Sequence, residues 1–384
     1  MAKNNNLKDF LTDVADAIRS KTGEAGLINP QDFSARIASI QTGGGGGDTP
    51  APSPTPTPDY PVIGDGKTYL YIKIAAEGRM TVPLYFSQSV ANGVTIDWGD
   101  GSAPQTVSGT SNVNTAHTYA EIGEYVISLD PVDGCTLGLG HNSSSYCVMG
   151  STSDNGRVYC NMLQAVEIGN NMTSIRNYAF SYCYSLASVV ISNSMASIGT
   201  YAFNYCSSLA SIVIPNGVAS IGRNAFSYCY SLASVVIPNS VTSIGTYAFQ
   251  NCYSLASVVI SNSMTSIGDY AFYSCSSLAS IVIPKSVTRI GARAFYSCYS
   301  LASVVIPNSV TSIDNNAFNS CSGMAFYDFS QATAVPNLTY TNAFSSIPSD
   351  CKIIVPDALY DEWIAATNWS TYASNIVKDS EFIR

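Results

Sequence analysis

Residues 237–255 read Ile-Pro-Asn-Ser-Val-Thr-Ser-Ile-Gly-Thr-Tyr-Ala-Phe-Gln-Asn-Cys-Tyr-Ser-Leu, and close variants of this stretch recur every 23 residues. Seven consecutive copies keep the Ala-Phe pair and the cysteine three residues after the phenylalanine. The phenylalanines are Phe180, Phe203, Phe226, Phe249, Phe272, Phe295 and Phe318, and the cysteines are Cys183, Cys206, Cys229, Cys252, Cys275, Cys298 and Cys321. A fixed period of roughly 20–50 residues predicts a solenoid, in which each repeat buries its apolar face only against its neighbours. Such a fold offers an extended surface for binding, and nothing in the repeat points to catalysis.

One segment of each period alternates like a short β-strand. We expect Val235 and Ile237 to point inward, whereas Ser234 and Val236 point outward. The same apolar register is already present at residues 163–168, so the solenoid is expected to begin near Cys160.

The whole motif, from Ile-Pro-Asn-Ser-Val to Cys-x-Ser-Leu, resembles the BspA-like class of bacterial leucine-rich repeats over residues 160–377. Trp363 and the segment 368–372 look like the C-terminal cap of this class, which predicts a solenoid over 160–330 and a cap over 331–384. The resemblance implies cell-surface adhesion and ligand binding, without naming the ligand.

Residues 61–134 contain several short alternating segments that predict a β-sandwich. Asp-Trp-Gly-Asp-Gly at 97–101, and His-Thr-Tyr at 117–119 followed by Gly-Glu-Tyr at 123–125, resemble the PKD family of immunoglobulin-like domains. That resemblance implies a spacer or adhesive module. The Gly-, Ser- and Asn-rich residues 135–159 are expected to form the junction and cover the first repeat.

Residues 1–42 are expected to form a short helical hairpin that anchors or oligomerises the protein. Its apolar positions are Leu7, Phe10, Leu11, Val14, Ile18, Phe33, Ile37 and Ile40. So short a segment cannot bury enough surface to be stable alone, so we expect it to form a homo-oligomer such as a trimer or to dock on a larger body. It looks like the leader of gut-phage structural proteins, which implies contacts with other virion proteins. The Gly- and Pro-rich residues 43–60 predict a tether.

Composition excludes several classes of function. Charged residues make up 11% of the chain, against about 25% in ordinary domains. The net charge is −9 and there is no Lys/Arg run, so nucleic acid is not an expected partner. No apolar stretch is long enough to span a membrane, and no secretory signal is recognisable.

No catalytic residue, metal site or cofactor is expected, and the chain is not predicted to be an enzyme. The histidines are His117, expected to be structural, and His141. Asp97 and Asp100 lie close enough in sequence to hold a cation, but such residues more often accept hydrogen bonds from turn amides.

The chain has 11 cysteines, and Cys160 falls one period before the first of the seven repeat cysteines. We expect this ladder of eight to be reduced, small and buried. Cys135 and Cys147 could pair, and the sequence alone does not decide this.

Tyrosines flank the conserved Phe and Cys, and these positions vary between repeats while the core positions are nearly invariant. The candidate ligand-binding residues are Tyr182, Tyr184, Tyr205, Tyr228, Tyr230, Tyr253, Tyr273, Tyr296 and Tyr299. Exposed Tyr with Ser and Asn suits sugars and protein loops alike. The alternative is that the tyrosines only stack on one another. A rival surface is the outward Ser and Val stripe of the strands.

The favoured prediction is a phage virion component, a tail fibre or receptor-binding protein, that contacts a host-surface glycan or protein. It would assemble in the bacterial cytoplasm, where free thiols are expected. The alternative is a bacterial cell-surface adhesin, and the third is an intracellular repeat scaffold.

Overall fold

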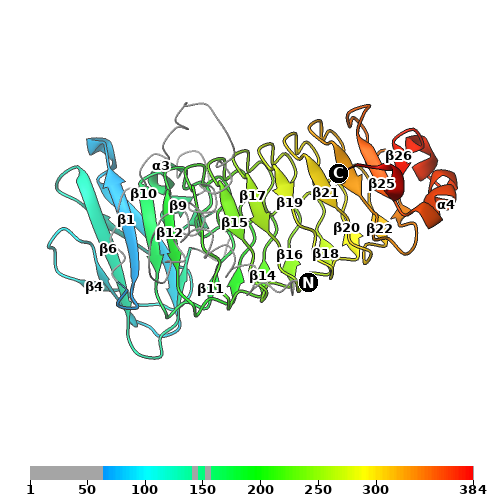
Figure 1. The fold of residues 1–384 in the computed structure, drawn as a ribbon. Helices are drawn as coiled ribbons and strands as arrows, with labels where there is room; N and C mark the ends of the chain where they lie inside the picture. Colours follow the sequence, from blue (N-terminus) through cyan, green and yellow to red (C-terminus); the bar gives the residue numbers. More distant parts are fainter. Residues whose placement is uncertain (1–63, 141–145, 152–156, 384) are drawn as a thin grey trace, which may run out of the picture. The chain divides into compact units, whose positions relative to one another are not determined.

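The computed structural model describes residues 64–140, 146–151 and 157–383 (Figure 1). The chain divides into two units, residues 1–57 and 58–384, and all described residues belong to the second. The expected helical hairpin with all its anchor residues, the expected tether at 43–60 and His141 fall outside the described residues.

Two antiparallel sheets with a common core form the N-terminal part of the described chain. The strands of the first sheet are β1 (Thr68–Ile74), β6 (Gly123–Pro131), β3 (Val94–Asp97) and β4 (Gln105–Thr106). The second places β2 (Thr81–Gln88) between β5 (Val113–Thr118) and β7 (Leu137–Leu139), and the 3-10 helix η1 (Glu77–Arg79) precedes β2. Leu70, Phe86 and Trp98 are buried in the shared core, as their apolar alternation requires.

The first of these sheets continues into the solenoid. Strand β1 pairs antiparallel with β6 on one side and with β10 (Leu163–Ile168) on the other. Strand β10 then pairs in parallel with β12 (Ser188–Ile191), which starts the repeat ladder. The small elements β8 (Tyr146–Cys147), β9 (Gly150–Ser151) and α3 (Arg157–Cys160) lie between β7 and β10 in sequence.

The repeats form two parallel ladders, visible in Figure 1 as successive arrows along the solenoid. The longer strands are β12, β15 (Ser234–Val236), β17 (Ser257–Val259), β19 (Ser280–Ile281), β21 (Ser303–Val305), β23 (Phe326–Asp328), β25 (Lys352–Val355) and β26 (Ile376–Lys378). The shorter strands are β11 (Ser174–Ile175), β13 (Ser197–Ile198), β14 (Ser220–Ile221), β16 (Ser243–Ile244), β18 (Ser266–Ile267), β20 (Arg289–Ile290), β22 (Ser312–Ile313) and β24 (Asn337–Leu338). Equivalent residues pair one period apart, for example Ser197 with Ser220, which confirms the predicted solenoid.

A continuous stack of phenylalanine rings fills the centre of the solenoid. From Phe180 to Phe344, consecutive ring centroids lie 5.1–5.6 Å apart and the rings are nearly parallel. Each of these side chains is fully buried. Val235 and Ile237 also point into the core, as predicted, and each is 1% exposed.

The C-terminal segment closes the end of the stack. It contains η2 (Asp357–Leu359), α4 (Tyr360–Ala365), η3 (Trp369–Tyr372) and η4 (Asp379–Glu381). Trp369 lies 5.5 Å from the last ring, Phe344, and its Nε1–H donates to the Pro336 carbonyl at 2.8 Å. Phe329, which replaces the usual Ile, packs edge-on against Trp363 and Trp369. The aromatic ring at this position therefore adds contacts with both indoles of the cap.

Candidate binding surface on the solenoid

Two positions in every loop have left-handed backbone. One precedes the conserved Ala (Tyr178, Tyr201, Asn224, Tyr247, Tyr270, Arg293, Asn316), and the other precedes the conserved Cys (Tyr182, Tyr205, Tyr228, Asn251, Ser274, Ser297, Ser320). Their φ angles lie between 52° and 64°. This conformation costs an L-residue about 1–2 kcal/mol, so something must offset it at every repeat.

Hydrogen bonds to the next repeat provide that offset. The N–H groups of Tyr178, Phe180 and Tyr182 donate to carbonyls of the following loop at 2.9, 2.8 and 2.7 Å. The same alternate donation recurs along the solenoid, for example from Tyr205 to the Ser227 carbonyl at 2.9 Å. The loops of successive repeats are thus joined by a third ladder of hydrogen bonds. The backbone geometry of this ladder determines the direction in which the tyrosine side chains point.

Six of the nine candidate tyrosines form one contiguous group, which we call the tyrosine cluster: Tyr182, Tyr184, Tyr205, Tyr228, Tyr230 and Tyr253. Tyr205 stacks between Tyr182 and Tyr228, with ring centroids 5.0 and 4.2 Å apart. Tyr230 meets Tyr228 edge-on at 6.1 Å and stacks on Tyr253 at 5.2 Å. Tyr184 contacts both Tyr182 and Tyr205 edge-on.

Tyr273 and Tyr296 stack separately, with centroids 5.0 Å apart. They are joined by Tyr270, which lies 5.7 Å from Tyr273 and 4.3 Å from Tyr247. The sequence did not single out Tyr247 and Tyr270 as binding residues, although they occupy the tyrosine-rich column before the conserved Ala. The recurrence of tyrosine in that column is the sequence feature that could have identified them.

The tyrosines are less exposed than the sequence suggested. Tyr253 and Tyr299 are 45% and 51% exposed, whereas the other seven candidates are half-buried. Rings stacked about 5 Å apart leave no room for a ligand between them. A ligand would therefore meet ring edges and hydroxyl groups, so the stacking and binding interpretations are compatible.

Three phenols of this surface, those of Tyr205, Tyr230 and Tyr273, have a raised pKa. Burial, followed by the neighbouring tyrosines, raises the pKa of Tyr205 to about 12. Burial also raises the pKa of Tyr230 and of Tyr273. These three hydroxyls therefore stay protonated near neutral pH and can both donate and accept hydrogen bonds.

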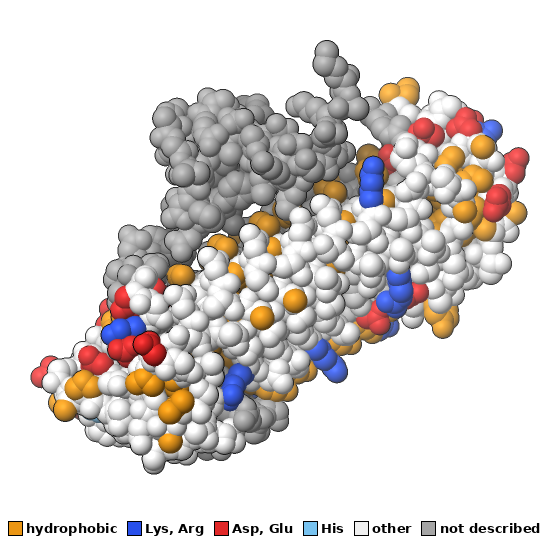
Figure 2. Space-filling view, turned by 90° about the horizontal axis from the view of Figure 1, so that it is seen from below, with side chains coloured by type: hydrophobic (Ala, Val, Ile, Leu, Met, Phe, Trp, Pro, Cys, Tyr) orange, Lys and Arg blue, Asp and Glu red, His pale blue; other side chains and the backbone are white. Residues whose placement is uncertain are grey.

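Charges are sparse over residues 160–330. The basic residues are Arg176, Arg223, Lys285, Arg289 and Arg293, and the acidic ones are Glu167, Asp269, Asp314 and Asp328. Figure 2 shows one face on which uncharged side chains and backbone dominate. The Arg157 guanidinium lies 3.9 Å from the Tyr182 ring centroid, at one end of the tyrosine cluster. The surface suits a ligand recognised by hydrogen bonds and ring contacts more than one recognised by charge.

The rival surface is the outer face of the longer strands. Val213, Val282 and Val305 are 43%, 79% and 56% exposed, and the serines of this stripe are half-buried or exposed. The side chains on it are short and repetitive, so this face offers little shape for selecting a ligand.

The two carboxylates of the acidic turn at 97–101 accept hydrogen bonds from turn amides. Asp97 Oδ1 accepts from the Gly99 N–H at 2.9 Å, and Asp100 Oδ1 accepts from the Ser102 N–H at 3.0 Å. His117 Nε2 lies 2.7 Å from Asp100 Oδ2, and its ring stacks on Trp98. Ser102 and then His117 lower the pKa of Asp100 to about 2. These contacts agree with the turn-amide interpretation.

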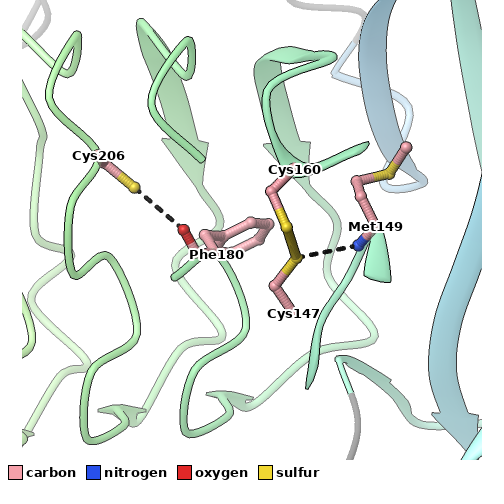
Figure 3. The surroundings of a disulfide bond; sticks show 5 residues. All are labelled: Cys147, Met149, Cys160, Phe180 and Cys206. Carbon is pink, nitrogen blue, oxygen red and sulfur yellow. Dashed lines mark hydrogen bonds between the residues drawn. A yellow bond between two sulfur atoms is a disulfide. The ribbon is translucent and has the colours of Figure 1, made fainter. Parts of the chain in front are cut away.

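The cysteine prediction is correct for the repeats and wrong at their start. Cys206 Sγ–H donates to the Phe180 carbonyl at 3.2 Å (Figure 3), and the equivalent bond recurs up to Cys321. Cys160, expected to be a reduced member of this ladder, instead forms a disulfide with Cys147. Cys135 is a free, buried thiol, so it does not pair with Cys147. Cys147 lies in the segment before the first repeat and outside the 23-residue period. The periodic pattern therefore gives no sign that Cys147 pairs with Cys160.

In the part of the chain that the structure describes, no helix is long and apolar enough to cross a membrane.

Comparison with known proteins identifies the repeats. The family profile described as BspA type leucine rich repeat region matches in six copies, over residues 158–256, 197–325 and 242–360. Together these matches span 158–360, more than half of the 384 residues. No curated protein matches the sequence.

Solved structures with similarity to the chain include three bacterial repeat proteins. A leucine rich cell surface protein from Faecalibacterium prausnitzii is 30% identical, with 46% of this chain and 62% of that chain covered and a TM-score of 0.29. A leucine-rich repeat protein from Eubacterium ventriosum is 23% identical, with 47% and 42% covered and a TM-score of 0.36. One from Bacteroides ovatus is 23% identical, with 70% and 79% covered and a TM-score of 0.37. The chain thus spans 62% and 42% of the first two proteins.

Proposed function

Because the chain belongs to the BspA-type leucine-rich repeat family, we propose that it is a non-enzymatic adhesion protein of a bacterial cell surface. Its solenoid contacts a glycan or protein on a host surface. The PKD-like residues 61–134 act as a spacer that also covers the first repeat through the pairing of β1 with β10.

The tyrosine cluster is the observation that carries this proposal. It gathers six aromatic side chains from four consecutive repeats on one edge of a rigid ladder. Rings held by stacking lose little side-chain entropy on binding, and their hydroxyls offer directed hydrogen bonds. Variation between repeats in these columns supports recognition of a particular ligand.

The Cys147–Cys160 disulfide supports the cell surface over the cytoplasm. Disulfides persist in oxidising compartments and are rare in the bacterial cytosol. The nine free cysteines are all buried, so exposure to an oxidising medium would leave them unmodified. This favours the adhesin over the virion component that the sequence predicts.

The virion prediction depends on residues 1–42, which lie outside the described residues. Proteomics of density-purified phage particles and of cell envelope from the same culture separates the two candidates. Enrichment in the envelope supports the adhesin, enrichment in particles supports the virion component, and a purely cytosolic protein excludes both.

The binding surface is tested by replacing Tyr228, Tyr230 and Tyr253 together with Ser. We expect the triple variant to stay folded and to bind host cells more weakly by more than ~1 kcal/mol, because aromatic anchors dominate interfaces. The matched control replaces Val236, Val259 and Val282 on the strand face with Thr, and should bind like the unmodified protein. Loss of binding in the control alone would move the site to the strand face, and loss in neither would argue against the solenoid as the binding part.

A further inference from the structure

Three cysteine sulfurs converge where the junction meets the first full repeat. The Sγ atoms of Cys147, Cys160 and Cys183 all lie within 4.8 Å of one another, and all three residues are buried. Cys147 comes from β8, Cys160 ends α3, and Cys183 is the first of the seven repeat cysteines. Two of the sulfurs are joined as a disulfide and the third is a free thiol.

Cys183 differs from the six repeat cysteines that follow it. Each of those thiols donates to the carbonyl of the phenylalanine 26 residues earlier, as Cys206 does to Phe180 (Figure 3). For Cys183 that position is Arg157 in α3, where the loop of the repeat is absent. Among the described residues, the Cys183 thiol has no hydrogen-bond acceptor, and its nearest reactive neighbours are the two sulfurs of the disulfide.

We propose that Cys147, Cys160 and Cys183 form an intramolecular thiol–disulfide exchange site, in which the disulfide can migrate to Cys183. In the step, Cys183 loses its proton and its thiolate attacks Sγ of Cys160. A Cys160–Cys183 bond forms, the Cys147–Cys160 bond breaks, and Cys147 leaves as a thiolate that takes up a proton. Attack on Cys147 instead gives a Cys147–Cys183 bond and frees Cys160. Both routes exchange one disulfide for another, so no outside oxidant or reductant takes part.

Migration would change what the disulfide holds together. The Cys147–Cys160 bond closes a segment within the junction, with a sequence separation of 13. Either bond to Cys183 would tie the junction covalently to the first full repeat, across a longer stretch of chain. The regular repeats end at this boundary, where β10 pairs with β1 of the antiparallel sheet, so this bond would reinforce the boundary covalently.

Burial controls the exchange. The apolar surroundings raise the pKa of the Cys183 thiol, so little thiolate is present at neutral pH. The same burial keeps external thiols away from the disulfide. Exchange is therefore expected to be slow in the closed protein and faster at higher pH, where more thiolate forms.

The test uses single serine variants of the full chain, refolded in a cystine/cysteine buffer, quenched in acid and mapped by mass spectrometry without reduction. We expect Cys147→Ser to contain a Cys160–Cys183 bond and Cys160→Ser to contain a Cys147–Cys183 bond. The matched control is Cys206→Ser, one repeat further along the same ladder, which should keep the Cys147–Cys160 bond. Folded variants in which the two remaining cysteines stay reduced would overturn the proposal.

A second measurement keeps the test decisive if those variants fail to fold. The unmodified protein is incubated at pH 8.5 without added thiol, sampled over hours, quenched in acid and mapped in the same way. We expect a fraction with Cys183 paired to appear and to grow faster than at pH 7. A map that shows only the Cys147–Cys160 bond at every time and at both pH values would overturn the proposal.

Discussion

At the scale of single residues, the two left-handed positions of each loop impose the same backbone requirement on every repeat. Tyr, Asn, Ser and Arg all occupy them, although bulky residues rarely adopt this backbone. Asn224, Asn251 and Asn316 share columns with the tyrosines, and Asn tolerates the left-handed region. The asparagines were thus a sequence signal for the turn, but the tyrosines in the same columns obscured it.

Relief of this backbone strain is best tested at Ser346, which is exposed and has a φ of 59°. We expect Ser346→Gly to keep or raise the free energy of unfolding by up to about 1 kcal/mol, because Gly adopts this backbone without a clash. The control is Ser349→Gly, an exposed position without positive φ, which should lower it by about 0.5–1 kcal/mol. Chemical denaturation measures both. Equal destabilisation by the two glycines would contradict the strain argument.

The tyrosine cluster predicts a pH dependence at the alkaline end. Tyr205 has a folded pKa of about 12, above the ordinary tyrosine value of 10.0. Its contribution to stability is therefore full below pH 10 and is lost as the pH rises through 12, because only the unfolded chain ionises readily in between. Urea denaturation at pH 9 and pH 11 should show a smaller loss of stability for Tyr205→Phe than for the unmodified protein. An equal loss of stability in Tyr205→Phe and in the unmodified protein would contradict this prediction.

At the scale of elements, the 23-residue period was enough to predict the strand ladders. Alternation placed Val235 and Ile237 inward, and the conserved Phe and Cys fell in the core, as the structure has them. The pairing of β1 with β10 was not predictable from the sequence. The two strands are separated by nearly a hundred residues, and no motif in either strand identifies the other as its partner. Antiparallel pairing depends on complementary edges, which a one-dimensional pattern does not encode.

The candidate site was predictable in part. Column positions identified the tyrosines, and six of them do form one contiguous cluster. Their partial burial was not predictable, because it results from stacking between repeats at 4.2–5.2 Å, which depends on the loop backbone. The same limit applies to Cys160, whose partner comes from outside the periodic sequence.

At the scale of the whole described unit, the repeats stack one after another, and a different structure covers each end of the stack. The antiparallel sheet covers the first repeat through β1, and the two tryptophans of the C-terminal cap cover the last rings. In such an array the free energy of unfolding is close to a sum of contributions from single repeats and from the contacts between neighbouring repeats. A destabilising substitution at one end should therefore affect only the few repeats nearest to it. A globular domain that unfolds in one cooperative step would instead lose its protection from hydrogen exchange at every element.

Two buried substitutions distinguish these behaviours. Leu70 lies in β1 and Trp363 in the C-terminal cap, and both are fully buried. Leu70→Ala should cost about 2–5 kcal/mol and Trp363→Ala about 3–5 kcal/mol locally. In hydrogen exchange followed by mass spectrometry, we expect Leu70→Ala to speed exchange in β10 and β12 while β25 and β26 stay protected, and Trp363→Ala to do the reverse. Faster exchange throughout the solenoid in either variant would show that the repeats unfold as one unit, and that the covers stabilise the whole ladder rather than its ends.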